Sequence, residues 1–85
     1  MLSETENNKL VLVYPNPNNG TIRIDNLSQE NWDSLRIIDI NGKQCFEKNI
    51  LNQNDIQISF ELKSGVYFLQ LINENELFMQ KIIMQ

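Results

Sequence analysis

Carboxylates are the most abundant groups in this chain that could do chemistry. The sequence holds eleven Asp and Glu residues among 85 residues, and no His. Two carboxylates at one site could hydrolyse a glycosidic bond, and loop acids with Asn could ligate calcium. No two acids are brought together by their spacing, and no Asp-x-Asp-x-Asp-Gly loop occurs, so a calcium site stays an open alternative. The acids considered for such sites are Asp25, Asp33, Asp39, Asp55, Glu61, Glu74 and Glu76.

A thiol and a glycine-rich loop are the other features that could indicate an enzyme. Cys45 is the only cysteine, so no intramolecular disulfide can form. A catalytic thiolate needs a base beside it, and the absence of His makes Cys45 a better candidate for a small buried hydrophobe. Only three glycines are present, and they form no phosphate-binding loop. The sequence therefore predicts no enzyme, no metal ligated by His or Cys, and no cofactor.

Two aromatic residues leave a binding function open. Trp32 and Tyr14 could form an exposed platform on which a sugar ring stacks. The alternative is that both rings cover the ends of a thin core, with the indole N–H or the hydroxyl reaching solvent or backbone. A carbohydrate-binding or adhesion module is accordingly one of the functions to be tested.

The charge balance argues against two classes of partner. The net charge is −4, and the Lys and Arg residues are scattered. Nucleic-acid binding needs clustered cations that neutralise phosphates, and anionic lipid head groups would repel a negative surface. No apolar run approaches the roughly 20 residues of a membrane-spanning helix. We therefore expect neither a nucleic-acid partner nor insertion into a membrane.

The first residues differ from the rest of the chain. Residues 1–9 are acidic and polar and lack the apolar segment of a signal peptide, so we expect a disordered leader there. Residues 10–85 are expected to form one domain. Taken literally, such a chain stays in the cytoplasm; it could equally be an excised piece of a longer exported protein.

The strongest strand signal lies in residues 62–71. Lys63, Ser64 and Gly65 interrupt the apolar pattern, and Tyr67, Leu69 and Leu71 then recur at a period of two. Side chains at this spacing share one face of a strand. Gly65 suits a turn that needs positive φ at the strand entrance.

Six further segments alternate or are rich in β-formers, at spacings near 8–12 residues, which predicts an all-β sandwich of about seven mainly antiparallel strands. They are residues 10–14, Thr21–Asp25, 35–40, 43–50, 56–58 and Leu77–Met84. The side chains predicted to be buried are Ile22, Ile24, Leu35, Ile37, Ile58, Tyr67, Leu69 and Leu71. Asn41-Gly42 predicts a two-residue type I′ hairpin turn, in which both residues have positive φ.

Four motifs, in this order and at this spacing, resemble a known family. They are Tyr14-Pro15-Asn16-Pro17-x-x-Gly20, Ile37-x-Asp39-x-x-Gly42-Lys43, Leu62-x-x-Gly65-x-Tyr67-x-Leu69-x-Leu71 and Lys81-Ile82-Ile83. Together they resemble the C-terminal sorting domain (type A) of the type IX, or Por, secretion system, over residues 13–85. Two departures are visible: Gln44-Cys45-Phe46 replaces a more aliphatic run, and Gln85 stands where a basic residue is common.

The resemblance implies a fold and a function. It implies an Ig-like β-sandwich at the end of an exported cargo protein of certain Gram-negative bacteria. Such a domain is non-catalytic: the type IX outer-membrane translocon recognises it after transit through the periplasm. A sortase-like protease then commonly removes it, and the cargo reaches the cell surface or is secreted.

The resemblance also implies roles for individual residues. The closing strand is expected to matter most for recognition by the translocon, through Lys81, Ile82, Ile83, Met84 and Gln85, with Gly65 and Tyr67 shaping the strand before it. The translocon could read a surface of the final strands or could add a strand to their edge, and the sequence leaves both open. The remaining motif residues are expected to be structural: Pro15, Asn16, Pro17, Gly20, Asp39, Gly42, Leu62, Leu69 and Leu71.

Overall fold

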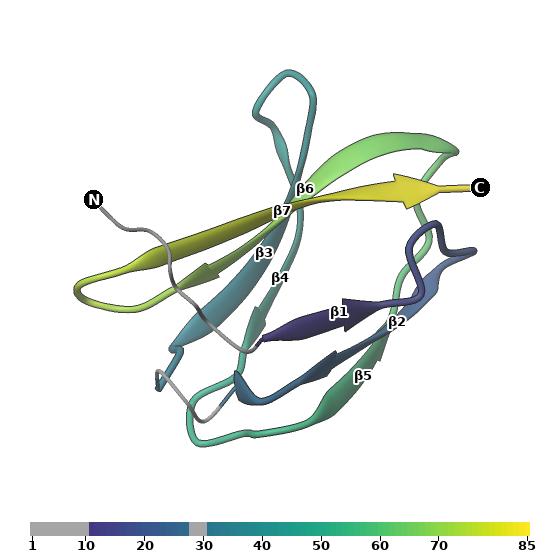
Figure 1. Ribbon diagram of the computed structural model, residues 1–85. Helices are drawn as coiled ribbons and strands as arrows, with labels where there is room; N and C mark the ends of the chain where they lie inside the picture. Colours follow the sequence, from purple (N-terminus) through teal and green to yellow (C-terminus); the bar gives the residue numbers. More distant parts are fainter. Residues whose placement is uncertain (1–10, 28–30) are drawn as a thin grey trace, which may run out of the picture.

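Seven antiparallel strands form two sheets that pack face to face (Figure 1). The computed structural model describes residues 11–27 and 31–85. The three-stranded sheet has the order β1-β2-β5, with β1 at Leu12–Tyr14, β2 at Thr21–Asp25 and β5 at Ile56–Ser59. The four-stranded sheet has the order β4-β3-β6-β7, with β3 at Ser34–Asp39, β4 at Gln44–Asn49, β6 at Gly65–Ile72 and β7 at Leu77–Met84.

This arrangement confirms the predicted all-β sandwich. All seven expected segments contain a strand, and the strand ends differ from the expected ones by at most three residues. The first two strands and the fifth lie in one sheet, and the third, sixth and seventh lie in the other, as in Ig-like sandwiches. The expected leader at residues 1–9 lies outside the described residues.

The core consists of the inward-facing side chains of both sheets. All eight side chains predicted to be buried are buried, and Leu69 and Leu71 of β6 have no exposed surface. The period-two pattern was sufficient for this result, because a strand with one buried face directs every second side chain inward. Strand β3 lies between β4 and β6, which agrees with its apolar residues on both faces.

Three loop residues complete the core. Leu27, Trp32 and Ile50 are each at most 2% exposed, although none lies within a strand. The Trp32 ring packs edge-on against Phe78, with 6.4 Å between ring centroids. A ring buried in this way cannot stack on a sugar, so Trp32 has the core role and not the platform role.

Tyr67 has a structural function at the start of β6. Its hydroxyl donates a hydrogen bond of 2.8 Å to the Lys63 carbonyl, four residues upstream. This is the tyrosine corner of Ig-like sandwiches, which fixes the chain where it enters the strand. Gly65 has φ +150°, as its position at the strand entrance predicted. The Gly65 and Tyr67 part of the third motif therefore builds the fold.

The predicted type I′ turn at Asn41-Gly42 is wrong, although the hairpin is present. Gly42 has φ +85°, but Asn41 is not among the residues with positive φ. The Gly42 N–H donates to the Asp39 carbonyl (3.0 Å) and the Asp39 N–H donates to the Lys43 carbonyl (2.9 Å), which closes a three-residue loop with glycine at the left-handed position. The Asp39 carboxylate accepts from the N–H groups of Asn41 and Lys43, both at 2.9 Å. These side-chain bonds favour the longer loop.

The first prediction concerns the core around β6. Leu69→Ala should lower the free energy of unfolding by about 2–5 kcal/mol, because the residue is fully buried and its truncation leaves a cavity. Leu77→Ala is the matched control, since Leu77 is 57% exposed on the neighbouring strand. It should change stability by no more than about 0.5 kcal/mol. Urea unfolding measures both, and equal effects of the two substitutions would contradict the assigned core.

The second prediction concerns the hairpin glycine. A Cβ at Gly42 would meet no atom within 4 Å, so any cost of substitution is conformational and not steric. Gly42→Val should destabilise the domain by about 1–2 kcal/mol or more, because a β-branched residue resists positive φ. Gly42→Asn should cost less, because Asn tolerates this conformation. Thermal unfolding that ranks valine equal to asparagine would refute the left-handed loop position.

Candidate functional site

The last strand divides the predicted recognition residues into two groups. Strand β7 pairs only with β6 in its sheet, so it is an edge strand. Ile82 is 0% exposed and Met84 is 3% exposed, because both point into the core. Lys81 and Gln85 are exposed, and Ile83 is 36% exposed. A partner of the folded domain can therefore touch Lys81, Ile83 and Gln85, but not the two buried side chains.

The side-chain amide of Asn16 pairs with the free edge of β7. Its Nδ2–H donates to the Lys81 carbonyl at 3.0 Å, and its Oδ1 accepts from the Ile83 N–H at 2.9 Å. The side-chain amide of Asn16 thus replaces a peptide group of a neighbouring strand, because it donates one hydrogen bond to β7 and accepts one from β7. The two contacts span 65 and 67 residues of sequence.

Asn18 extends this pairing with its own backbone. Its N–H donates to the Ile83 carbonyl (2.9 Å), and its carbonyl accepts from the Gln85 N–H (2.8 Å), which forms a parallel bridge to Met84. Asn18 is 2% exposed, and its side-chain oxygen accepts from the Gly20 N–H at 2.9 Å. Figure 1 shows the loop between β1 and β2 beside the C-terminal end of β7.

Gly20 allows this loop to lie close to the rest of the chain. It has φ +113°, and a Cβ there would lie 3.1 Å from the Phe60 carbonyl oxygen. The Phe60 N–H also donates to the Gly20 carbonyl at 2.9 Å. The peptide bonds before Pro15 and Pro17 are both cis. The first motif is thus a loop that binds the last strand, and we call residues 15–18 the edge-binding loop.

A surface network holds the residue before this loop. The Tyr14 hydroxyl donates to Asp25 Oδ2 at 2.6 Å and accepts from Arg23 Nε at 3.3 Å. The hydrogen bond with Tyr14 and the nearby charge of Asp25 raise the pKa of the Arg23 guanidinium above its ordinary value. Because arginine is already protonated at physiological pH, this pKa shift does not change the charge of Arg23 there. The network occupies the Tyr14 hydroxyl in a contact within the protein.

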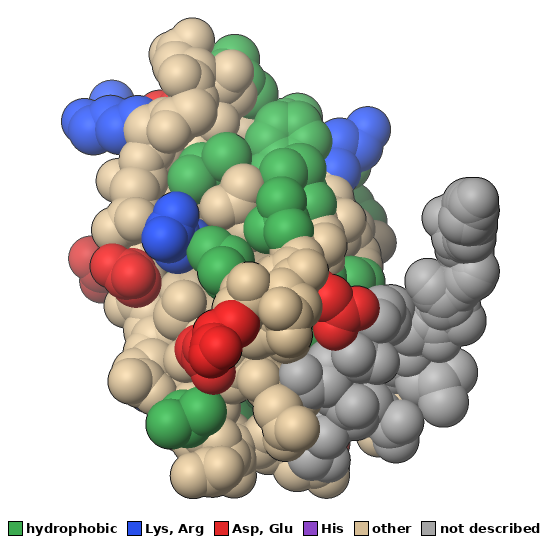
Figure 2. All heavy atoms as spheres, turned by 90° about the vertical axis from the view of Figure 1, so that its left-hand side faces the viewer, with side chains coloured by type: hydrophobic (Ala, Val, Ile, Leu, Met, Phe, Trp, Pro, Cys, Tyr) green, Lys and Arg blue, Asp and Glu red, His purple; other side chains and the backbone are tan. Residues whose placement is uncertain are grey.

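The outer face of the four-stranded sheet carries exposed apolar side chains near the same end of β7. Val66 lies opposite Ile83, and Phe68 lies opposite Lys81 on one side and Ile38 on the other. Val66 is 38% exposed. Figure 2 shows hydrophobic side chains gathered on one face of the molecule, with side chains of both charges, Lys and Arg as well as Asp and Glu, around them. An apolar surface of this kind on a small domain is typical of a contact with another macromolecule.

Three of the four motifs meet around β7, and the motif of Asp39 and Gly42 lies on β3 and its hairpin, on the other side of β6. Only some of the motif residues are accessible. Gly65 lies opposite Met84 and Tyr67 lies opposite Ile82, so two motifs are adjacent strands. Leu69 and Leu71 belong to the core, and Leu62 is half-buried against it. Sequence reasoning missed Asn18, because an Asn between Pro and Gly indicates a turn and nothing local indicates a partner 65 residues away.

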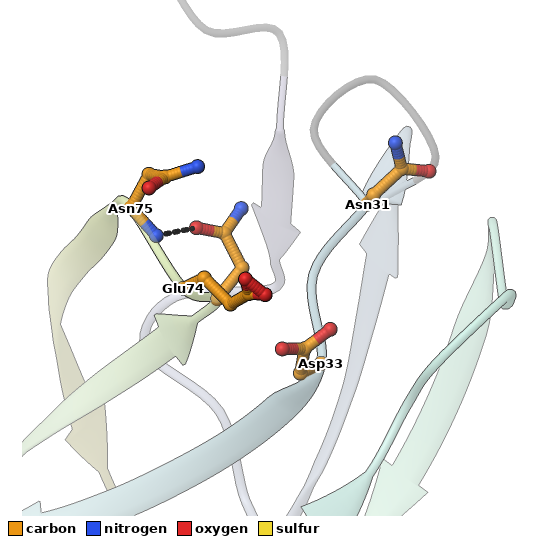
Figure 3. Close-up of a pocket in the computed structure, with 5 residues that line it drawn as sticks. Asn31, Asp33, Glu74 and Asn75 are labelled. Atoms are coloured by element: carbon orange, nitrogen blue, oxygen red, sulfur yellow. Dashed lines mark hydrogen bonds between the residues drawn. The ribbon is translucent and has the colours of Figure 1, made fainter.

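A polar cleft lies at the other end of β7. It is lined by Asn31 and Asp33 before β3 and by the turn between β6 and β7 (Figure 3). The turn uses Asn73 Oδ1 itself, which accepts from the N–H groups of Asn75 (2.9 Å) and Glu76 (2.7 Å). Among residues 11–27 and 31–85, no three or more Asp, Glu, Cys or His side chains are grouped so that they could hold a metal ion.

No helix in the described part of the chain has the length and apolarity needed to cross a membrane.

The third prediction tests the edge-binding loop. Asn16→Asp removes the donor to the Lys81 carbonyl and places a negative charge there, so it should destabilise the domain by about 1–2 kcal/mol. Asn19→Asp makes the same charge change at an exposed position of the same connection and should alter stability by less than about 0.5 kcal/mol. Urea unfolding at neutral pH measures the difference. Equal stability of the two variants would show that the Asn16 contact contributes nothing.

One comparison with known proteins finds a family for this chain. No curated protein sequence matches the chain. A family model described as the secretion system C-terminal sorting domain matches residues 12–85, which include every strand of both sheets and the edge-binding loop. This family provides the C-terminal sorting signal of cargo for the type IX secretion machinery, which leads to the cell surface or to secretion, and such domains are in general non-catalytic. The chain belongs to the family of type IX secretion C-terminal sorting domains.

Proposed function

We propose that this domain guides a cargo protein, attached at its N-terminal side, from the periplasm through the type IX outer-membrane translocon. A sortase-like protease then removes the domain. The observation that carries the proposal is the match to the sorting-domain family over residues 12–85. The carbohydrate-binding alternative depended on Trp32 and Tyr14, and Trp32 is 2% exposed.

In this proposal the translocon reads the exposed side chains at the C-terminal end of β7. Ile83 and Lys81 point away from the core, and the Lys81 carbonyl and both backbone groups of Ile83 already have partners in the edge-binding loop. Strand addition to this segment would first have to displace Asn16 and Asn18. Recognition of side chains requires no such step, so it is the simpler of the two modes that the sequence left open.

The fourth prediction concerns export. A passive reporter placed between a signal peptide and residues 12–85 should reach the cell surface in a host that has this machinery. The same reporter without the domain should stay in the periplasm. Digestion of the reporter by protease added to intact cells measures the surface fraction. If the full fusion stays in the periplasm while a native cargo is exported, the proposed function is wrong.

Single substitutions then separate recognition from folding. Lys81→Ala removes an exposed side chain but keeps the carbonyl that Asn16 binds, so stability should change by less than about 0.5 kcal/mol. We expect the surface fraction of the fusion to fall. Lys48→Ala on β4, at the opposite edge of the sheet, is the control and should be exported normally. Normal export of the Lys81→Ala fusion would exclude that side chain from the recognition surface.

A further inference from the structure

An isoleucine at the tip of the β3–β4 hairpin is mostly exposed to solvent. Ile40 is 71% exposed, the largest value among the exposed hydrophobic side chains of the described residues. Turns at such positions usually carry polar residues. The Asp39 carboxylate accepts hydrogen bonds from the N–H groups of Asn41 and Lys43, which hold the loop backbone around Ile40.

Ile40 forms one wall of a cleft with a mainly apolar lining. The opposite wall is the entrance to β6, with Lys63, Gly65 and Val66. Because Gly65 has no side chain, the cleft is open above the backbone at that point. Val66 lies opposite Ile83, so the cleft continues into the apolar surface next to the end of β7. The hairpin, the glycine motif and the last strand thus share one continuous surface.

Two lysines lie at this surface, although the chain carries a net charge of −4. Lys63 and Lys81 are both exposed, and within residues 11–27 and 31–85 neither forms an ion pair. The only carboxylate that lines the cleft is Asp39, whose Oδ1 is already bonded to two backbone N–H groups. A partner that is complementary to this surface therefore carries an apolar side chain with carboxylates beside it.

We propose that the Ile40–Val66 cleft is a docking site for an apolar side chain, flanked by acidic residues, on a protein of the export machinery. The inference rests on the proposed function and adds a second contact beyond the last strand. The apolar side chain fills the space between Ile40 and Val66, and the acidic residues pair with Lys63 and Lys81. A central apolar contact with charges at its rim is the usual organisation of protein interfaces.

The test uses the reporter fusion and paired variants. Ile40→Ser removes the apolar wall of the cleft. Leu51→Ser is the control, because Leu51 is also exposed (51%) but lies far from the cleft. It follows the end of β4 that pairs with Ser34, at the opposite end of the sheet from the hairpin. Ile40→Ser should reduce the surface fraction by about tenfold or more, which corresponds to ~1.4 kcal/mol of lost binding free energy. Leu51→Ser should be exported like the unchanged fusion. Melting temperatures of the purified domains should agree within about 2 °C, as expected for exposed sites.

Reversing the charge of Lys63 provides a second, independent test. Lys63→Glu should reduce export by a similar factor of about ten, because it would repel the carboxylates of the partner. Lys63→Arg should retain export, and Lys48→Glu should be neutral. Normal export of both the Ile40→Ser and the Lys63→Glu fusions would overturn the docking site. If the fusion without any substitution stays in the periplasm, the proposed function itself is overturned.

Sedimentation of the purified domain tests a different occupant of the cleft. The proposal predicts a monomer. A dimer that Ile40→Ser dissociates would assign the cleft to a second copy of this chain and would contradict the proposal.

Discussion

The free edge of the last strand is the constraint on which this structure depends. A strand at the edge of a sheet leaves a row of N–H and C=O groups without partners, which can pair with other chains. Here Asn16 and Asn18 pair with the Lys81 carbonyl, both backbone groups of Ile83 and the Gln85 N–H. The loop that provides them follows β1 in the other sheet, so the same hydrogen bonds also join the two layers at one corner of the sandwich.

Closure of this edge explains why the motifs of the family lie far apart in the sequence. The proline motif at residues 15–17 binds the terminal strand, and the glycine motif provides the strand that pairs with its other side. Asp39 and Gly42 shape the hairpin whose tip flanks the entrance of β6. Most motif residues therefore maintain the shape of one end of the domain. The surface that a partner can reach is formed by Ile40, Val66, Lys81 and Ile83.

Much of this fold could be predicted from the sequence, because the strands alternate clearly. Residues such as Ile22, Ile24, Leu69 and Leu71 are buried as their period indicated. The turn type could not be predicted from Asn41-Gly42, because the Asp39 side chain provides two hydrogen bonds that favour a longer loop. The type of the turn is thus decided by a residue outside the dipeptide.

The candidate site was less predictable, because it depends on contacts between distant segments. The terminal strand was identified through the family motifs, but its alternation alone did not show that Ile82 and Met84 would be buried and Lys81 and Ile83 exposed. The pairing of Asn16 with Ile83 joins residues 67 apart and leaves no periodic signal in the sequence. Trp32 lies in a polar segment, so its burial depended on packing against Phe78.

Amide hydrogen exchange at the end of β7 tests the closed edge most directly. The Ile83 amide should be protected in the unchanged domain, because Asn16 Oδ1 accepts its hydrogen bond. In Asn16→Ala this amide should lose protection, while the amide of Ile82, which faces β6, should keep it. An Ile83 amide that exchanges at the rate of an unprotected peptide in the unchanged domain would contradict the account, because the edge would then be open.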